Sequence, residues 1–82
     1  MTFAENLRRQ RIQHFLSQGE LASRAGIHAV TVTRLEMGST VPSLRTVRAL
    51  AAALGVEPRE LADPEEVAEV RRSSRIGRTS RD

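Results

Sequence analysis

Cysteine, lysine, tryptophan and tyrosine are all absent from this chain of 82 residues. Without cysteine there is no disulfide framework, no thiolate zinc site and no cysteine nucleophile. The chain also lacks a glycine-rich phosphate loop and a serine near a paired histidine and acid, so we expect no catalytic residue and no enzyme. Its only aromatic residues are two phenylalanines. The core must therefore be aliphatic, and no aromatic platform is present for stacking single-stranded RNA.

Long apolar runs are missing as well. No stretch approaches the ~18 residues that a membrane span needs, and the N-terminus lacks the basic and apolar regions of a secretory signal. The two histidines, His14 and His28, do not have the spacing of a metal site, and no third ligand is evident. We expect a cytoplasmic protein with no cofactor, no metal and no membrane partner.

The charges that are present divide the chain into three parts. Residues 1–56 hold seven arginines against three glutamates, and residues 57–70 hold one arginine against six acids. Residues 71–82 hold five arginines against one aspartate. The first part is therefore attracted to phosphate and the second is repelled by it.

Residues 18–37 have the pattern of two short helices joined by a tight turn. Ser17 and Glu20 lie three apart, the spacing of a capping box, which predicts a helix start at Gln18. Gly26 can enter the left-handed region and end that helix without steric cost. Apolar residues at helical spacing resume directly after it. This pattern predicts a helix-turn-helix unit.

The second helix of this unit has two chemically different sides when it is unrolled at 100° per residue. One side carries small, methyl-bearing and guanidinium groups, from Ala29, Val30, Thr33, Arg34 and Met37. The opposite side, which we expect to be buried, carries His28, Thr31, Val32 and Leu35. Arginine pairs with guanine, and methyl groups contact the thymine methyl, so the first side suits base edges in a DNA major groove.

Several spaced motifs extend this pattern along the chain. They are LSQGELA at residues 16–22, AGI at 25–27, RLEMG at 34–38, VPSL at 41–44 and AALGV at 52–56. Over roughly residues 3–62 the chain resembles the Cro/C1-type (XRE, phage repressor-like) helix-turn-helix family. This resemblance implies an all-α fold, a compact five-helix bundle, and a regulator that binds an operator as a dimer.

Further helix signals set the expected boundaries. A capping-box pair at Thr2 and Glu5 predicts a first helix, with a buried side formed by Phe3, Leu7, Ile12, Phe15 and Leu16. A fourth helix is predicted from about Ser43 to Gly55, and a short fifth helix over 57–61. We expect a helix-turn-helix DNA-binding domain over residues 1–62, an acidic C-terminal helix over 63–72, and a disordered Arg/Ser-rich tail over 73–82.

The resemblance also implies roles for individual residues. Gln18 is expected to bind a phosphate and steady the recognition helix, and Arg11 and Glu36 to form an ion pair that orients this helix. Bases are expected to face Ala29, Val30, Thr33 and Arg34, with His28 and Thr31 nearer phosphates. The loop before the fourth helix is expected to contact phosphate through Ser39, Thr40 and Ser43, with Arg45 nearby.

Three residues depart from the family pattern. Phe15 stands where the family usually has the glycine that ends the first helix, so that end must differ or the ring must find a pocket. His28 replaces the usual Ser or Thr cap of the recognition helix. Gly19, inside the second helix, costs about 1 kcal/mol relative to alanine.

We expect a sequence-specific regulator of double-stranded DNA, a repressor, that reads the major groove as a homodimer and is nucleoid-associated when bound. Half-sites about one helical turn apart would match such a dimer. Val67 and Val70 either form dimer contacts or cover the core. No small-molecule effector is expected, because the bundle leaves no room for a ligand-binding domain. Control is expected to come from protein concentration, proteolysis or a regulatory protein partner.

A second class of function stays open. The chain could be an antitoxin or accessory interaction module that binds a basic partner protein through the acidic residues 57–70. A restriction-modification controller and a phage Cro-like protein both suit this length, and the sequence does not choose between them.

Overall fold

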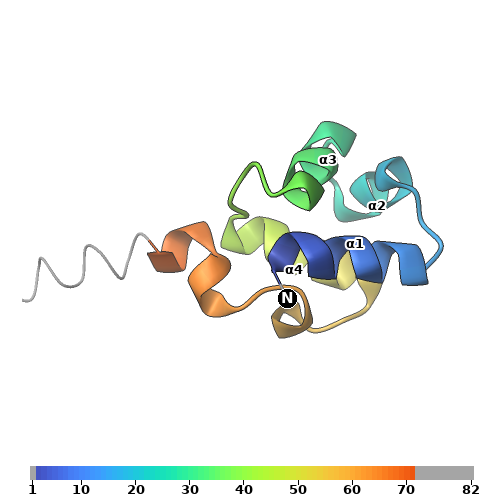
Figure 1. Cartoon of the computed structure of the whole chain (residues 1–82). Coiled ribbons are helices and arrows are strands. Elements are labelled where there is room, and N and C mark those ends of the chain that lie inside the picture. Colours follow the sequence, from blue (N-terminus) through green and yellow to red (C-terminus); the bar gives the residue numbers. More distant parts are fainter. Residues whose placement is uncertain (1, 72–82) are drawn as a thin grey trace, which may run out of the picture.

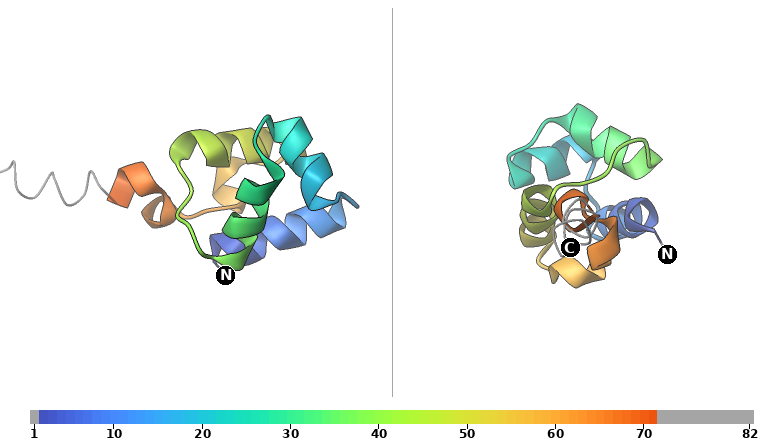
Figure 2. Two further views of the ribbon diagram at one scale, coloured as in Figure 1. Left: turned by 90° about the horizontal axis from the view of Figure 1, so that it is seen from above. Right: turned by 90° about the vertical axis from the view of Figure 1, so that its left-hand side faces the viewer.

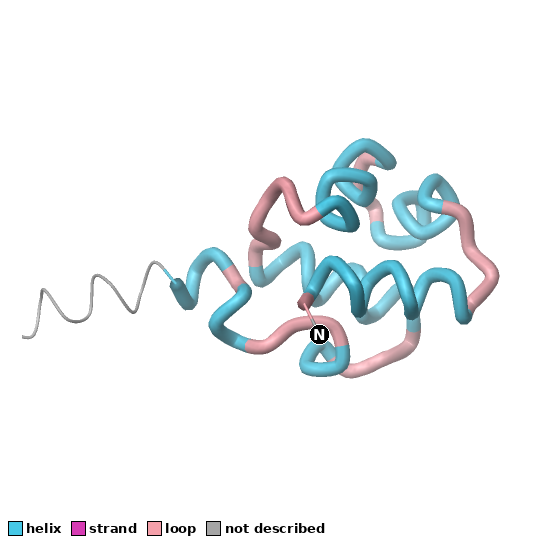
Figure 3. Tube along the Cα trace, in the orientation of Figure 1, coloured by secondary structure: helices cyan, strands magenta, loops and turns pink. Residues whose placement is uncertain are grey.

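The computed structural model describes residues 2–71, and these form an all-helical bundle without strands (Figure 3). The α-helices are α1 (Phe3–Gln13), α2 (Gln18–Ala25), α3 (Ala29–Met37) and α4 (Leu44–Leu54). Two 3-10 turns follow, η1 (Pro58–Glu60) and η2 (Pro64–Glu66). The predicted all-α bundle is confirmed. Within the described part of the chain no helix has the length and apolarity needed to cross a membrane.

The predicted helix starts are found at the expected residues. Thr2 and Glu5 cap α1 reciprocally, with the Thr2 amide donating to the Glu5 carboxylate at 2.9 Å. Ser17 and Glu20 cap α2 in the same way, at 2.8 Å. Hydrogen bonds from these backbone amides lower the pKa of both glutamates. The Ser43 hydroxyl caps α4 by accepting from the Thr46 amide at 3.1 Å.

All four helices end in the same way. After each one a residue adopts a left-handed conformation, and the next amide donates back to a carbonyl five residues earlier. Gly26, Gly38 and Gly55 fill this position after α2, α3 and α4, with φ between 69° and 75°. Phe15 fills it after α1, with φ 56°. A side chain with a Cβ costs about 1–2 kcal/mol in this conformation, whereas glycine costs nothing comparable.

The helices are arranged in layers. α1 and α4 lie side by side in the middle, α2 and α3 cover one side of them, and η1 lies on the other side (Figures 1 and 2). The core between them is aliphatic apart from one ring, and comprises Phe3, Leu7, Leu16, Leu21, Ala22, Val32, Leu35, Val47, Leu50, Ala51, Leu54, Leu61, Ala62 and Val67. No polar or charged residue of the described chain is fully buried.

Two residues predicted to lie on the buried side of the first helix are exposed. Ile12 is 47% exposed and Phe15 is 93% exposed, whereas Leu16 enters the core at 8%. Ile12 lies within α1, but at 100° per residue it is about 140° around the helix from the buried Leu7. For Phe15 the prediction extended helical periodicity past the end of α1 at Gln13. The left-handed turn instead directs Phe15 outward and Leu16 inward, so the ring finds no pocket.

The segment after α4 differs from the two helices predicted there. Residues 57–61 form only the single turn η1, and the predicted helix over 63–72 is interrupted. Its first turn is η2, Val67 is extended with ψ 135°, and helical geometry resumes at residues 68–71. This break turns Val67 into the core, where it is 4% exposed. The predicted tail over 73–82 lies outside the described residues.

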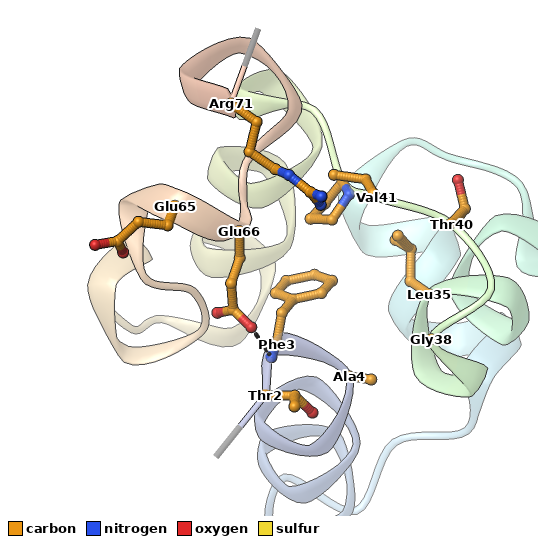
Figure 4. A pocket seen from close by; sticks show the side chains of 11 residues that line it. Thr2, Phe3, Ala4, Leu35, Gly38, Thr40, Val41, Glu65, Glu66 and Arg71 are labelled. Atoms are coloured by element: carbon orange, nitrogen blue, oxygen red, sulfur yellow. Dashed lines mark hydrogen bonds between the residues drawn. The ribbon is translucent and has the colours of Figure 1, made fainter. Parts of the chain in front are cut away.

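Carboxylates of this segment cap helices that are far away in the sequence. Glu66 accepts from the Phe3 amide at the start of α1, at 2.8 Å (Figure 4), and from the Asp63 amide at 2.9 Å. Glu69 accepts from the Leu44 amide at the start of α4, at 2.8 Å. Both carboxylates therefore lie at the positive ends of helix dipoles. Two carboxylates of the acidic segment therefore attach it to the starts of α1 and α4.

We expect Glu66→Ala to lower the free energy of unfolding by about 1–2 kcal/mol, because two backbone amides lose a charged acceptor. Urea titration followed by circular dichroism would measure this loss. Glu65→Ala is the matched control, since Glu65 is an exposed neighbour with no such bond. Equal losses in the two variants would contradict the capping role.

Candidate nucleic-acid interface

The two helices and glycine turn predicted over residues 18–37 are present. α2 packs against α3, and Gly26 ends α2 with φ 72°. Both helices lie on the same side of the molecule, above the layer formed by α1 and α4 (Figure 1). The fold therefore presents the helix-turn-helix unit on one exposed side.

The exposed face of α3 is close to the predicted one. Val32 and Leu35 are buried at 2% exposure or less, and both belong to the core. Thr31 is half-buried. The exposed side chains of this helix are those of Ala29, Val30, Arg34 and Met37. Small apolar groups and one guanidinium thus share a surface that nothing in the described chain covers.

His28 does not lie on the buried side of α3, where helical periodicity predicted it. It is exposed, because it is the residue before α3 and has extended backbone angles, φ −78° and ψ 145°. Its side chain makes no capping hydrogen bond. The first amides of α3 therefore have no side-chain acceptor, which leaves the positive end of this helix open to an anion.

Arg11 and Glu36 form the ion pair that links α1 to α3. The Arg11 Nε and Nη2 atoms lie 2.6 Å and 2.9 Å from the two oxygens of Glu36. Arg11 Nη1 also donates to the Leu16 carbonyl at 2.8 Å. The two side chains are only 13% and 4% exposed. A bidentate contact of this kind fixes the direction of both groups.

The network continues from Glu36 into the helix-turn-helix unit. Gln18 Nε2 donates to Glu36 Oε1 at 3.0 Å, and the Thr33 hydroxyl donates to Gln18 Oε1 at 2.7 Å. A carboxylate only accepts, so the Gln18 amide nitrogen must face Glu36. One chain of hydrogen bonds thereby joins the start of α2 and the helix α3 to α1.

This network changes what two predicted contact residues can offer. Thr33 is half-buried, and its hydroxyl lies within hydrogen-bonding distance of both Gln18 and the Ala29 carbonyl. It is committed inside the protein and does not present a hydroxyl to a base. Gln18 uses one of its two amide protons on Glu36, and one remains.

The network also sets the ionisation of Glu36. Burial by itself would raise the pKa of this carboxyl. Hydrogen bonds from Arg11 and Gln18, together with the positive charges of Arg11 and Arg8, outweigh burial, and the pKa is lowered below its usual 4.5. The hydrogen bond to Glu36 raises the pKa of Arg11. The pair is therefore charged at neutral pH.

Some polar residues in and after the loop before α4 cap helices, and others are exposed without a capping role. The Ser39 hydroxyl donates to the Arg34 carbonyl at 3.1 Å and closes the end of α3. Ser43 caps α4, and its hydroxyl also donates to Thr46. Thr40 and Arg45 are exposed. Ser39 is exposed as well, but its hydroxyl proton is already donated within the protein.

The candidate dimer contacts do not share a surface. Val67 is 4% exposed and belongs to the core, whereas Val70 is 38% exposed. Of the two interpretations left open by the sequence, covering the core applies to Val67. Among residues 2–71, no cluster of three His, Asp or Glu side chains is arranged to hold a metal ion.

Two features of this site escaped the sequence analysis. The sequence gives no sign that Leu16 supplies a carbonyl to Arg11, since backbone acceptors carry no residue signature. Arg8 contributes to the field around Glu36 because it lies one turn before Arg11 on α1, and that i, i+3 spacing was a usable signal.

The lowered pKa of Glu36 makes stability depend on pH in a defined direction. Its contribution is complete above the ordinary carboxyl pKa and is lost as the pH falls through the lower folded value. We expect Glu36→Gln to lose roughly 3–5 kcal/mol of stability at pH 7, because Arg11 is left unpaired. The difference from the wild type should shrink below about pH 4.5.

Urea unfolding of both proteins between pH 7 and pH 3 would measure this. Glu20→Gln serves as the control, since Glu20 is an exposed helix cap whose pKa is also lowered. A difference for Glu36→Gln that does not change with pH would refute an ionic role.

Comparison with protein families matches residues 2–64 to the family described as "Helix-turn-helix domain". Comparison with curated proteins found no match. Among solved structures, the restriction-modification controller protein C.AhdI from Aeromonas hydrophila is 41% identical, with a TM-score of 0.71. The match covers 72% of this chain and 89% of that one.

A second similar structure is the DNA-binding domain of the P22 C2 repressor. It is 26% identical, with a TM-score of 0.71, and the match covers 74% of this chain and 80% of that one. The family match spans the four α-helices and the exposed face of α3 described above. This chain therefore belongs to the Cro/C1-type helix-turn-helix family and is a DNA-binding regulator.

Proposed function

We propose that this protein is a sequence-specific transcriptional repressor that binds double-stranded DNA as a homodimer and places α3 in the major groove. The observation that carries the proposal is the exposed Ala-Val-Arg face of α3, held in a fixed direction by the network through Glu36. A rigid helix with a short, partly apolar face suits direct contact with base edges.

The charge on this half of the molecule supports the proposal. Each of the three acids in residues 1–56 is bound within the protein: Glu5 and Glu20 in capping boxes and Glu36 by Arg11. The arginines there, except for Arg11, are exposed. The exposed charges of residues 1–56 are therefore six arginines against Glu5 and Glu20, the same balance of +4 as in the sequence, which favours association with phosphate.

We assign base contacts to Ala29, Val30 and Arg34. Arg34 would pair with a guanine edge, and the two apolar residues would contact thymine methyls. Phosphate contacts are assigned to the remaining Gln18 amide proton, the open start of α3 beside His28 and Thr31, and the exposed Thr40 and Arg45. Thr33, Ser39 and Ser43 are assigned to hold these groups in place.

A homodimer remains part of the proposal, with half-sites about one helical turn apart. The buried Val67 is not available for its interface. The higher identity to a restriction-modification controller than to a phage repressor favours the controller setting among those that the length allows. A methyltransferase gene next to this one would support that setting.

The alternative, an interaction module that uses acidic residues 57–70, has less support. Glu60, Glu66 and Glu69 each accept a hydrogen bond from a backbone amide of this chain. These carboxylates act as caps, and a basic partner would have to compete for them. Co-purification of a second protein would favour this alternative.

Selection of bound duplexes from a random pool tests the proposal directly. We expect an enriched near-palindrome, whose two halves report the dimer and whose spacing reports its geometry. A pool that shows no enrichment at low ionic strength would rule out sequence-specific binding.

Arg34→Ala should weaken binding to the selected duplex by roughly 1–3 kcal/mol and relax preference at one base position in each half-site. Fluorescence anisotropy with single-base variants of the duplex would measure both effects. Arg59→Ala is the matched control, because η1 lies on the opposite side of the bundle (Figure 2). Similar losses in the two variants would contradict base contact by Arg34.

Arg45→Ala should weaken binding to all duplexes alike and reduce the slope of log affinity against log salt by about 1 per site. Titrations between 50 and 200 mM salt would measure this slope. A loss of affinity that depends on one base position would instead indicate that Arg45 contacts a base.

A further inference from the structure

Phe15 occupies a backbone position that the other three helix ends of this protein give to glycine. After each helix an amide donates to a carbonyl five residues earlier: Leu16 to Arg11, Ile27 to Ala22, Ser39 to Arg34 and Val56 to Ala51. The turn is the same each time, and only α1 places a side chain with a Cβ in the left-handed residue. The chain therefore holds an unfavourable conformation at Phe15 that a glycine would relieve.

Burial does not compensate for this conformation. The Phe15 side chain is 93% exposed, so its ring gains almost nothing from the core. The adjacent Leu16 provides the apolar contact that usually accompanies such a helix end. A strained backbone that carries an exposed ring is a reason to look for a role in binding.

The surroundings of Phe15 indicate what kind of molecule it meets. Residues 6–19 contain three arginines and one histidine but no acid. Glu20, the next acid, is bound to the Ser17 amide. Ile12, one turn earlier on α1, adds a second partly exposed apolar group. An apolar group with a cationic border fits a polyanion that also offers carbon surface.

The position of Phe15 connects it to the proposed DNA interface. It lies in the loop that rises from α1 to the start of α2, on the way to the side that carries α3 (Figure 1). Ser17 caps α2, and Gln18, three residues after Phe15, is the assigned phosphate contact. A sugar-phosphate backbone bound at Gln18 would therefore pass close to residue 15.

We infer that Phe15 is an additional DNA contact that packs against the deoxyribose carbons of the strand bound by the start of α2. This inference rests on the proposed function and extends its contact surface beyond the residues that read bases. Sugar contacts position a protein on the duplex and carry no direct sequence information. The contribution of Phe15 should therefore be independent of the bases at the edge of the site.

Two variants separate this role from folding. Phe15→Gly removes the ring and relieves the backbone, so its melting temperature should rise by about 4–8 °C. Phe15→Ala removes the ring but keeps a Cβ, so its melting temperature should stay near that of the wild type. Both should bind a selected duplex with several flanking base pairs about tenfold more weakly, which corresponds to about 1.4 kcal/mol.

Duplex length provides the matched control. When the duplex is trimmed to the base pairs enriched in the selection, wild type and both variants should bind with similar affinity. Unchanged affinity of Phe15→Gly on the long duplex would overturn the inference, as would an equal loss on both duplexes. Weaker self-association of the variants in sedimentation, sufficient to explain the loss, would overturn it too.

The proposed function and this inference fail in different ways. If the wild type binds no duplex at low salt, both are wrong. If the wild type binds and Arg34→Ala weakens binding while Phe15→Gly does not, the proposed function stands and only the role of Phe15 is lost.

Discussion

A single carboxylate, that of Glu36, joins three helices of this protein. It accepts two hydrogen bonds from Arg11 of α1 and one from Gln18 of α2, while it belongs to α3. Desolvating such a pair is costly, and apolar residues of similar size often stabilise a fold as well or better. What the ionic arrangement adds is direction. Each partner has one geometry that satisfies it, so α3 is held at a defined angle and depth relative to α1 and α2.

Several carboxylates of the bundle have a structural role as helix caps, although most of them remain exposed to solvent. Glu5 and Glu20 cap the helices on which they lie. Glu66 and Glu69 reach back from the end of the described chain to cap α1 and α4. This use has an electrostatic consequence. These carboxylates lie at helix starts, and the helix-turn-helix unit itself exposes Arg24 and Arg34.

At the end of α1 an unfavourable backbone conformation is not offset by burial of the side chain. Helices α2, α3 and α4 are each followed by a glycine that suits the left-handed turn. Helix α1 is followed by Phe15, whose ring lies in solvent. Natural proteins commonly retain residues that reduce stability where those residues serve recognition. The same reasoning does not apply to Ile12, whose partial exposure on a regular helix is ordinary.

Capping boxes at Thr2 and Ser17 and glycines after α2, α3 and α4 made the helix boundaries readable in the sequence, because each signal acts within about five residues. The family motifs added the fold and the pairing of Arg11 with Glu36. The sequence did not reveal the burial of Val67, the inward hydroxyl of Thr33 or the cap that Glu66 places on Phe3, 63 residues away. These features depend on which segments meet in space. A contact with a distant amide or with the core can stabilise a side chain more than its local sequence pattern does. The sequence by itself determined the starts of α1, α2 and α4 and the glycine ends of α2, α3 and α4, because those signals are local. The tertiary structure alone decided which of their polar groups remain available for DNA, because that depends on contacts between distant segments.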